Sequence, residues 1–327
     1  MRGVHDTPSC QDIPHKKDFR PVTGCVFGAG KRPFSVVHLR LADTLSPDNS
    51  GERHRVQFYP VHHNHENTTR VRYSLPGIHK RRQLMKIFAV NGSPNMKKGM
   101  THILLENFLE GAREAGAEVE TVFLQKKKIN YCLGCFNCWV KTPGVCIHKD
   151  DMPELTEKVR QADCVVIGTP LYVDGMTAQT KTFIDRMMPL ADPHFEFVDG
   201  HYRHPKKHGG GNPDIVLVSV CGFYERDNFD GLIDHVSRIC RNMQSRFIGA
   251  VVRPSSYMLA LQEVLADQIE EIKGAARRAG RELVEKGTLS SQVLDDVARD
   301  YLPKEAFLKG SNEFWDRCIK EGKFLAM

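Results

Sequence analysis

The sequence predicts an α/β fold in which a five-stranded parallel sheet is covered by helices on both faces. Two observations lead to this prediction. From residue 86 onward, short runs rich in Val and Ile alternate with longer segments of helical period. The first run, 87–90, ends at the turn sequence Asn91-Gly92-Ser93-Pro94, and a helical segment follows. Strands that are separated by helices pair in parallel through right-handed crossovers, so a doubly wound sheet is expected.

The predicted elements alternate along the chain, with one cysteine-rich loop after the second strand. Strands are expected at 87–90, 118–124, 164–168, 215–220 and 247–252. The first helix is expected to be capped by Thr101, and a second to open at 150–154 with Asp as cap and Pro in its first turn. Further helices are expected over 178–190, 229–246 and 261–286, with shorter C-terminal helical pieces over 290–323. Residues 191–213 are polar and contain His, and we interpret them as an insertion.

The net positive charge of the chain comes from its first 84 residues. These hold 14 Lys and Arg against 7 Asp and Glu, whereas the remainder holds 32 against 33. Residues 1–84 are also rich in His and show neither a strand nor a helix period. We interpret them as a disordered extension that the native protein need not contain, because Met85 directly precedes the first strand. No aromatic interleaving or basic helical face supports nucleic-acid binding by this segment.

No targeting or membrane segment is apparent in the sequence. No apolar run approaches the ~18 residues that a membrane span requires. The first basic residues are not followed by the apolar core of a secretory signal. A cytoplasmic protein without a membrane partner is therefore expected.

The loop between the first strand and the first helix has the features of an anion site. Ser93 and Thr101 offer hydroxyls, Asn95 offers an amide, and the start of the helix offers free backbone N–H groups. Five strands that begin with such a loop fit the flavodoxin-like order 2-1-3-4-5, whose ligand lies beside the first strand. In that order the loops 91–101, 169–177 and 221–228 converge on one edge of the sheet.

The second and third loops provide an apolar slot with polar edges. They contain Thr169, Pro170, Leu171 and Tyr172, and then Cys221, Gly222 and Phe223. A phosphate site beside a flat apolar slot is what flavin mononucleotide (FMN) requires.

Three pieces of this sequence carry a resemblance to a known family: Gly92-Ser93-Pro94, 168–172 and 181–186. Over about 86–286 the chain resembles the NAD(P)H-dependent FMN reductase branch of flavodoxin-like proteins. The resemblance implies FMN bound by the three loops named above. We expect the pair Asp185-Arg186 to be structural and to pack its helix against the loop or against a partner subunit.

The cysteine-rich loop, 131–149, is the sharpest chemical signal in the chain. Cys132, Cys135 and Cys138 follow one another at intervals of three residues, and Cys146 comes eight residues later. Sets of this kind hold iron–sulfur clusters, although the spacing to Cys146 differs from the bacterial ferredoxin pattern. A zinc site and free thiols are the alternatives, while zinc more often uses two separated Cys pairs. Disulfides are not expected without a secretion signal.

Within the FMN reductase branch, this loop resembles that of the iron–sulfur flavoproteins, which implies a [4Fe–4S] cluster near the flavin. Cys164, Cys240 and Cys318 fit strand or helix patterns and are interpreted as small buried apolar residues. Cys221 is expected to line the flavin pocket. Cys10 and Cys25 receive no role.

The sequence thus predicts an oxidoreductase that passes electrons between NAD(P)H or ferredoxin and an acceptor through FMN and a [4Fe–4S] cluster. No catalytic side chain is named, since the cofactors carry the chemistry. Two alternatives remain, a cluster-free NAD(P)H-dependent FMN or quinone reductase and a zinc-stapled interaction module without enzymatic activity. Relatives imply a homodimer or homotetramer.

Overall fold

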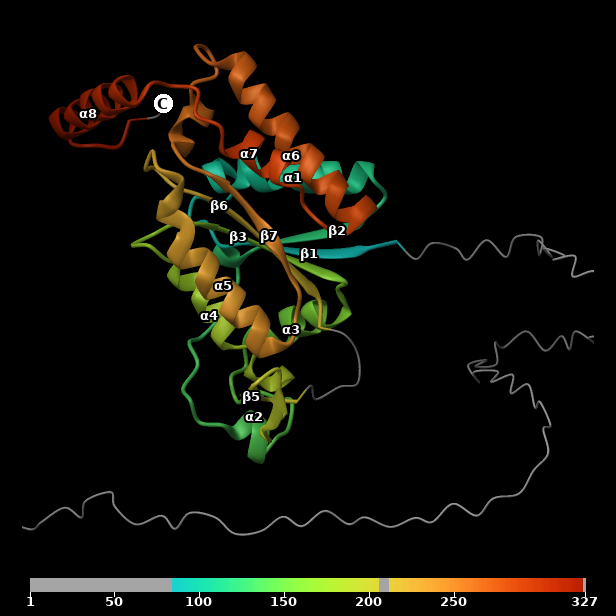
Figure 1. The fold of residues 1–327 in the computed structure, drawn as a ribbon. Coiled ribbons are helices and arrows are strands. Elements are labelled where there is room, and N and C mark those ends of the chain that lie inside the picture. Colours follow the sequence, from blue (N-terminus) through green and yellow to red (C-terminus); the bar gives the residue numbers. More distant parts are fainter. Residues whose placement is uncertain (1–83, 206–211, 326–327) are drawn as a thin grey trace, which may run out of the picture. The chain divides into compact units, whose positions relative to one another are not determined.

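The computed structural model describes residues 84–205 and 212–325 (Figure 1). Its main sheet contains β1 (Lys86–Asn91), β2 (Glu118–Phe123), β3 (Cys164–Pro170), β6 (Asp214–Val220) and β7 (Phe247–Arg253). All neighbouring strands are parallel, and their order is β2-β1-β3-β6-β7. This is the predicted order 2-1-3-4-5 when only the strands of this sheet are counted. The predicted basic extension, including Cys10 and Cys25, lies outside the described residues apart from Leu84.

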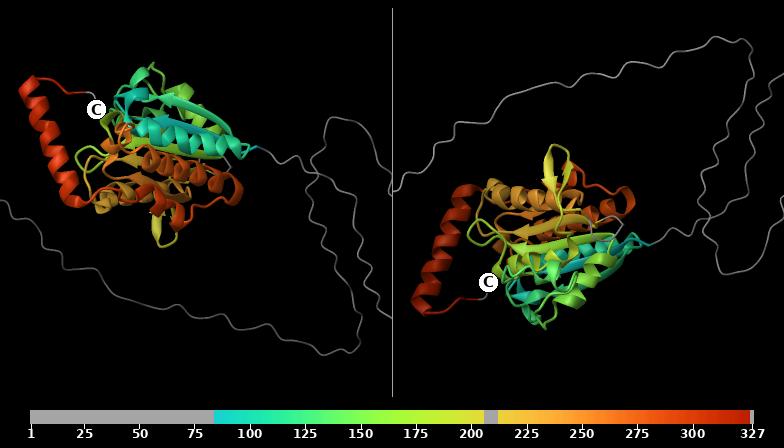
Figure 2. Two further views of the ribbon diagram at one scale, coloured as in Figure 1. Left: turned by 90° about the horizontal axis from the view of Figure 1, so that it is seen from above. Right: turned by 90° about the horizontal axis from the view of Figure 1, so that it is seen from below.

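Helices cover both faces of the sheet, as the alternation of elements predicts (Figure 2). One layer contains α1 (Met100–Glu114), α6 (Ala266–Lys286) and α7 (Ser291–Ala298), and the other contains α3 (Met152–Gln161), α4 (Ala178–Asp185) and α5 (Asp230–Met243). Side chains of β1 alternate between the two cores: Phe88 and Val90 pack with the second layer, and Ile87 and Ala89 with the first. Because side chains on both faces of β1 are buried, the sequence of this strand is a continuous apolar run.

The first layer depends on a close approach of α1 to α6. A Cβ atom added to Gly280 would lie 1.8 Å from the carbonyl oxygen of Phe108, and one added to Gly111 would lie 1.9 Å from that of Arg277. The two helices therefore touch through their backbones at these positions, where only glycine fits.

The start of α1 differs from the prediction. The helix begins at Met100 with Gly99 as its N-cap, so Thr101 lies inside the first turn and does not cap it. The prediction was wrong because the preceding loop winds into a short 3-10 helix, Met96–Lys98, which brings Gly99 to the cap position.

The predicted insertion at 191–213 contains an antiparallel hairpin, β4 (Glu196–Val198) and β5 (His201–Arg203). Asp199 and Gly200 connect its strands with φ angles of 49° and 78°. Asp-Gly is a strong hairpin signal, because both positions of this turn type need positive φ. The hairpin was not predicted within the insertion, since each of its strands has only three residues.

The remaining α-helices of the described residues are α2 (Asn137–Val140) in the cysteine-rich loop and α8 (Lys304–Glu321) near the C-terminus. In Figure 2, α8 projects past the edge of the sheet where the strands end. Within the described ranges, no helix combines the length and apolar character that a membrane crossing requires.

Candidate functional site

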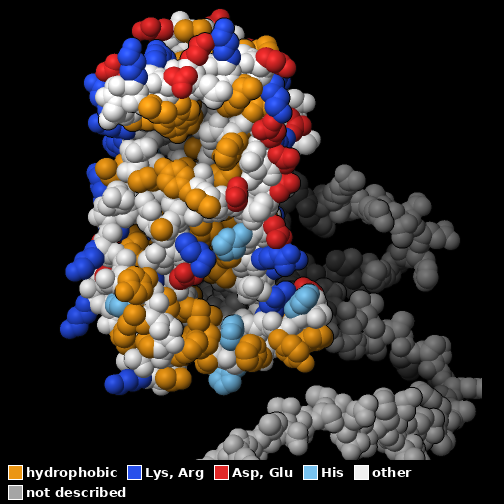
Figure 3. Space-filling view, turned by 90° about the vertical axis from the view of Figure 1, so that its left-hand side faces the viewer, with side chains coloured by type: hydrophobic (Ala, Val, Ile, Leu, Met, Phe, Trp, Pro, Cys, Tyr) orange, Lys and Arg blue, Asp and Glu red, His pale blue; other side chains and the backbone are white. Residues whose placement is uncertain are grey.

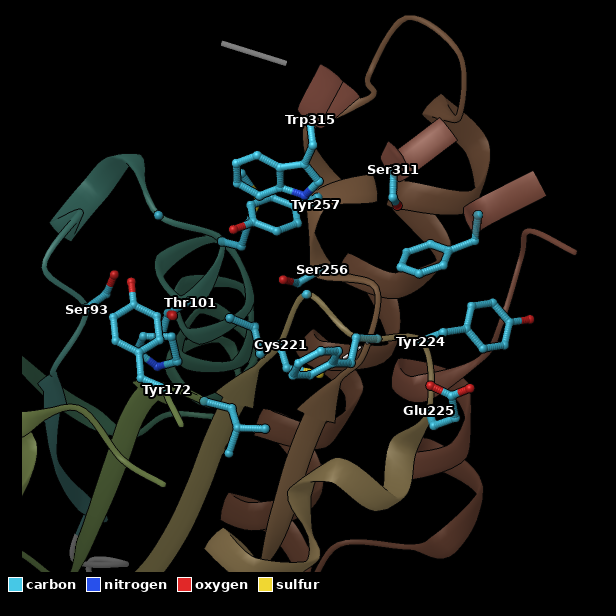
Figure 4. Close-up of a pocket in the computed structure, with 18 of the residues that line it drawn as sticks. Ser93, Thr101, Tyr172, Cys221, Tyr224, Glu225, Ser256, Tyr257, Ser311 and Trp315 are labelled. Atoms are coloured by element: carbon cyan, nitrogen blue, oxygen red, sulfur yellow. Dashed lines mark hydrogen bonds between the residues drawn. The ribbon is translucent and has the colours of Figure 1, made fainter. Parts of the chain in front are cut away.

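A cavity of about 800 Å³ opens at the carboxyl edge of the sheet (Figure 4). Its walls come from the loops after β1, β3, β6 and β7 and from α8. Of the ten residues predicted to bind a cofactor, nine line it: Ser93, Asn95, Thr101, Pro170, Leu171, Tyr172, Cys221, Gly222 and Phe223. The three predicted loops therefore meet at one cavity.

One end of this cavity is rich in hydrogen-bond donors. Thr101 is 1% exposed, and its Oγ1 atom has no hydrogen-bond partner among the described residues. The Ser93 hydroxyl accepts a hydrogen bond of 3.3 Å from the backbone N–H of Asn95, so its own hydrogen is free to point elsewhere. Because α1 begins at this point, its unpaired N–H groups and dipole favour an anion beside these hydroxyls.

Two glycines keep this end of the cavity tightly folded. A Cβ atom on Gly92 would lie 1.8 Å from Thr180 Oγ1, and one on Gly99 would lie 2.8 Å from Ser93 Oγ. The hydroxyl of Thr177 also donates a 2.7 Å hydrogen bond to the carbonyl oxygen of Gly92. The loop after β1 is thereby fastened to the start of α4.

Thr169 is the one predicted cofactor-binding residue that does not line the cavity. It is fully buried, and its Oγ1 atom accepts a 3.1 Å hydrogen bond from the backbone N–H of Thr177. Its hydroxyl also donates to the carbonyl oxygen of Pro170 at 3.1 Å. Thr169 therefore stabilises the conformation of the loop through these hydrogen bonds. The structure does not support the prediction that Thr169 contacts the ligand directly.

Aromatic side chains form much of the cavity wall. Tyr172, which lies beside Ser93 and Thr101 in Figure 4, is 48% exposed, and Phe223 is 59% exposed. Away from this end, Tyr257 and Trp315 line the cavity from the loop after β7 and from α8 (Figure 4). A Cβ atom on Gly222 would lie 3.0 Å from the Tyr257 ring, so glycine lets this ring lie against the backbone. Flat aromatic surfaces of this kind suit a planar ligand.

The thiol of Cys221 also lines the cavity. Burial raises its pKa to about 11, despite hydrogen bonds that lower it. At neutral pH it is an uncharged thiol, so it can line the cavity without acting as a nucleophile.

Sequence reasoning missed the residues that α8 and the loop after β7 contribute. Ser256 and Tyr257 could have been predicted, because the fifth strand ends at the same edge of the sheet as the others. Phe307, Ser311 and Trp315 were not, because no local pattern places α8 over this edge.

The four predicted metal ligands gather at a second, smaller cavity. Cys132, Cys135, Cys138 and Cys146 all line it, together with the apolar side chains of Phe136, Ile147 and Met188. All four are free thiols. Burial, and then the charges of the other three cysteines, raise the pKa of Cys138. Within the described residues, however, no three His, Cys, Asp or Glu side chains are placed to hold one metal ion.

The hairpin insertion supports the cysteine-rich loop. Trp139, in α2, donates a 2.8 Å hydrogen bond from Nε1 to the carbonyl oxygen of Met188. Its ring lies 4.9 Å from that of His204, which stacks on Phe195 at 4.8 Å. In Figure 3, apolar side chains and histidines gather at the lower end of the molecule, where Figure 1 places α2 and β5. The insertion thus has a structural role beside the thiols.

The other cysteines and the pair Asp185-Arg186 also have defined places. Cys164, Cys240 and Cys318 are buried, as predicted. Asp185 pairs with Lys181 at 2.6 Å on the surface, whereas Arg186 is buried against the cysteine-rich loop. The prediction that this pair joins its helix to the loop therefore holds for Arg186 alone.

Comparison with known proteins agrees with this architecture. Residues 85–201 match the family model described as NADPH-dependent FMN reductase. An iron–sulfur flavoprotein of Methanocaldococcus jannaschii is 38% identical over 143 residues, which are 43% of this chain and 71% of the relative. An iron–sulfur flavoprotein of Archaeoglobus fulgidus is 45% identical over 105 residues, 32% of this chain and 46% of the relative. The chain thus spans less than half of this second relative.

A solved FMN-dependent NADH-azoreductase from Bacillus anthracis is 18% identical, with a TM-score of 0.45 over 60% of this chain and 99% of the azoreductase. Sequence identity over most of the first relative's length, together with the family model, settles the assignment. The chain belongs to the NADPH-dependent FMN reductase family and is an oxidoreductase.

Proposed function

We propose that this protein binds FMN in the 800 Å³ cavity and transfers electrons between a nicotinamide nucleotide or ferredoxin and an acceptor. The observation that carries the proposal is the unpartnered, buried Thr101 hydroxyl at the start of α1, at one end of a cavity with aromatic walls. A buried hydroxyl without a partner is costly unless a ligand completes it. Relatives in this family are named as flavoproteins, which supports the same ligand.

The residues of the cavity fit FMN at both ends. Ser93, Asn95 and Thr101, with the start of α1, would hold the phosphate. Tyr172, Phe223 and Tyr257 would cover the flavin ring and exclude water. Bound FMN supplies hydride and single-electron transfer, so the protein need only bind, orient and shield it.

We further propose that Cys132, Cys135, Cys138 and Cys146 hold a [4Fe–4S] cluster. Four thiols around one cavity with otherwise mainly apolar walls are the donor set that such clusters use. The relatives named iron–sulfur flavoproteins support this part of the proposal. A bound cluster supplies one-electron transfer. Homodimers or homotetramers remain our prediction for the assembly.

A cluster-free FMN or quinone reductase is the second candidate. It is favoured by the placement of the thiols, since the described residues contain no group of three ligand side chains around a single ion position. The same observation gives no support to the zinc-stapled module.

The FMN site is tested by titrating FMN into apoprotein and following flavin fluorescence. Thr101→Val removes the unpartnered hydroxyl and keeps the shape of the side chain. Loss of a hydrogen bond to a charged group costs about 1.5–3 kcal/mol, so we expect FMN to bind about 10- to 100-fold more weakly.

Thr121→Val is the matched control, because Thr121 Oγ1 is also buried and has no partner in the described part of the chain, but belongs to β2 and does not line the cavity. Equal weakening by both substitutions, or no binding of FMN to the wild-type protein, would refute the proposed site.

A further inference from the structure

Arg186 is a buried cation that the FMN cavity does not use. Its guanidinium donates two hydrogen bonds to the carboxylate of Asp150, from Nη1 to Oδ2 at 2.7 Å and from Nη2 to Oδ1 at 3.1 Å. Both side chains are excluded from solvent, at 1% and 0% exposure. Burying two charged groups costs desolvation free energy. The two hydrogen bonds of this bidentate ion pair compensate for that cost.

The partners of Arg186 lie at the two ends of the cysteine-rich loop. Its Nη1 atom also donates a 2.6 Å hydrogen bond to the carbonyl oxygen of Asn130, just before Cys132, while Asp150 follows Cys146. The Asp150 carboxylate in turn accepts hydrogen bonds from the backbone N–H of Asn130 at 3.0 Å and from its side-chain amide at 3.2 Å. One ion pair therefore closes the loop that carries all four thiols.

The guanidinium also lies near one of these thiols. Cys146 precedes by four residues the Asp150 carboxylate that Arg186 binds, and it is within range of the charge of Arg186. The Nε atom of Arg186 is buried and has no hydrogen-bond partner among the described residues. A guanidinium with an unused donor thus lies near a sulfur atom that we have proposed as a cluster ligand.

We propose that Arg186 is a positioning residue for the cluster, which closes the cysteine-rich loop and holds a positive charge near the sulfur of Cys146. The inference rests on the proposed [4Fe–4S] site. Positive charge near a ligating sulfur stabilises the reduced cluster and raises its reduction potential. Arg186 therefore sets the potential, whereas Asp150 moderates its charge.

The experiment measures iron content and the midpoint potential of the cluster in full-length protein purified without oxygen. Arg186→Gln removes the cation, and we expect the ratio of reduced to oxidised cluster at a fixed potential to fall about tenfold, a shift of about 59 mV for one electron. Asp150→Asn leaves the cation uncompensated, so the potential should move in the opposite direction. Arg186→Lys retains the charge and should restore part of the wild-type potential.

Lys181→Gln is the matched control, since it removes an exposed cation from the same helix. We expect its iron content and potential to equal those of the wild-type protein. A purely structural role would lower iron content in both Arg186→Gln and Asp150→Asn and would leave the potential of the remaining cluster unchanged.

That result, or shifts of the same sign in the two variants, would overturn the inference for Arg186 alone. Wild-type protein without iron and sulfide would instead overturn the cluster itself and this inference with it.

Discussion

Arg186 and Asp150 form a bidentate ion pair whose side chains are both excluded from solvent, although they are 36 positions apart in the sequence. The pair joins the end of α4 to the end of the cysteine-rich loop. It therefore links the helical layer beside the sheet to the proposed cluster site, and it closes that loop with a buried ion pair.

Removing one member of this pair should destabilise the protein strongly. Asp150→Asn leaves a buried guanidinium without its counter-ion, which typically costs about 3–5 kcal/mol. We expect a decrease of this size in the free energy of unfolding, measured in urea. Asp185→Asn is the control, because the Asp185–Lys181 pair is exposed and should change stability by less than about 1 kcal/mol. Equal effects of the two substitutions would contradict the structure.

The same pair predicts how stability depends on pH. Burial alone would raise the pKa of Asp150, but hydrogen bonds from Arg186 and from the backbone of Asn130 and Met152 lower it to about 2 from an ordinary value of 3.8. As the pH falls, the Asp150 carboxyl is therefore protonated in the unfolded state before it is protonated in the folded state. The contribution of Asp150 to the free energy of unfolding is complete above about pH 4 and is lost as the pH falls toward 2. The contribution is about 2 kcal/mol.

This dependence is measured by comparing the unfolding free energies of wild type and Asp150→Asn between pH 7 and pH 3. The difference between them should shrink as the pH falls below 4. A difference that stays constant down to pH 3 would show that the Asp150 carboxyl has an ordinary pKa.

The contact between α1 and α6 should not tolerate a methyl group. Gly280→Ala places a Cβ atom 1.8 Å from the carbonyl oxygen of Phe108, so the helices must separate. We expect a loss of about 1–3 kcal/mol, as for other overpacked sites. Gly310→Ala in α8 is the control: nothing lies within 4 Å of its added Cβ, so the substitution should stabilise by about 0.5–1 kcal/mol. Thermal unfolding of both variants checks the prediction.

Both proposed cofactor sites could be predicted from local sequence patterns. The strands and the edge where their loops meet follow from local patterns, and Ser93, Tyr172 and Phe223 accordingly line one cavity. The four cysteines could be identified from their spacing alone. In both cases the signal lies within a few residues of chain.

The rest depends on contacts that no local pattern encodes. The roles of Arg186 and Trp315 arise from elements that pack together across long stretches of chain. Thr101 lines the cavity to which it was expected to offer its hydroxyl, although it does not cap the helix as predicted. Thr169 was expected to contact the ligand, but its hydroxyl accepts a hydrogen bond within its own loop instead.

The most direct test of the account is an absorption spectrum of protein purified without oxygen, with flavin, iron and sulfide assayed on the same sample. We predict flavin bands with a broad shoulder from the cluster, and about four iron atoms per chain for a [4Fe–4S] centre. Cys135→Ser should lose the iron and retain the flavin, because Cys135 lines only the smaller cavity. Flavin without iron in the wild-type protein would contradict the cluster and leave a simple FMN reductase, and protein without flavin would contradict the account as a whole.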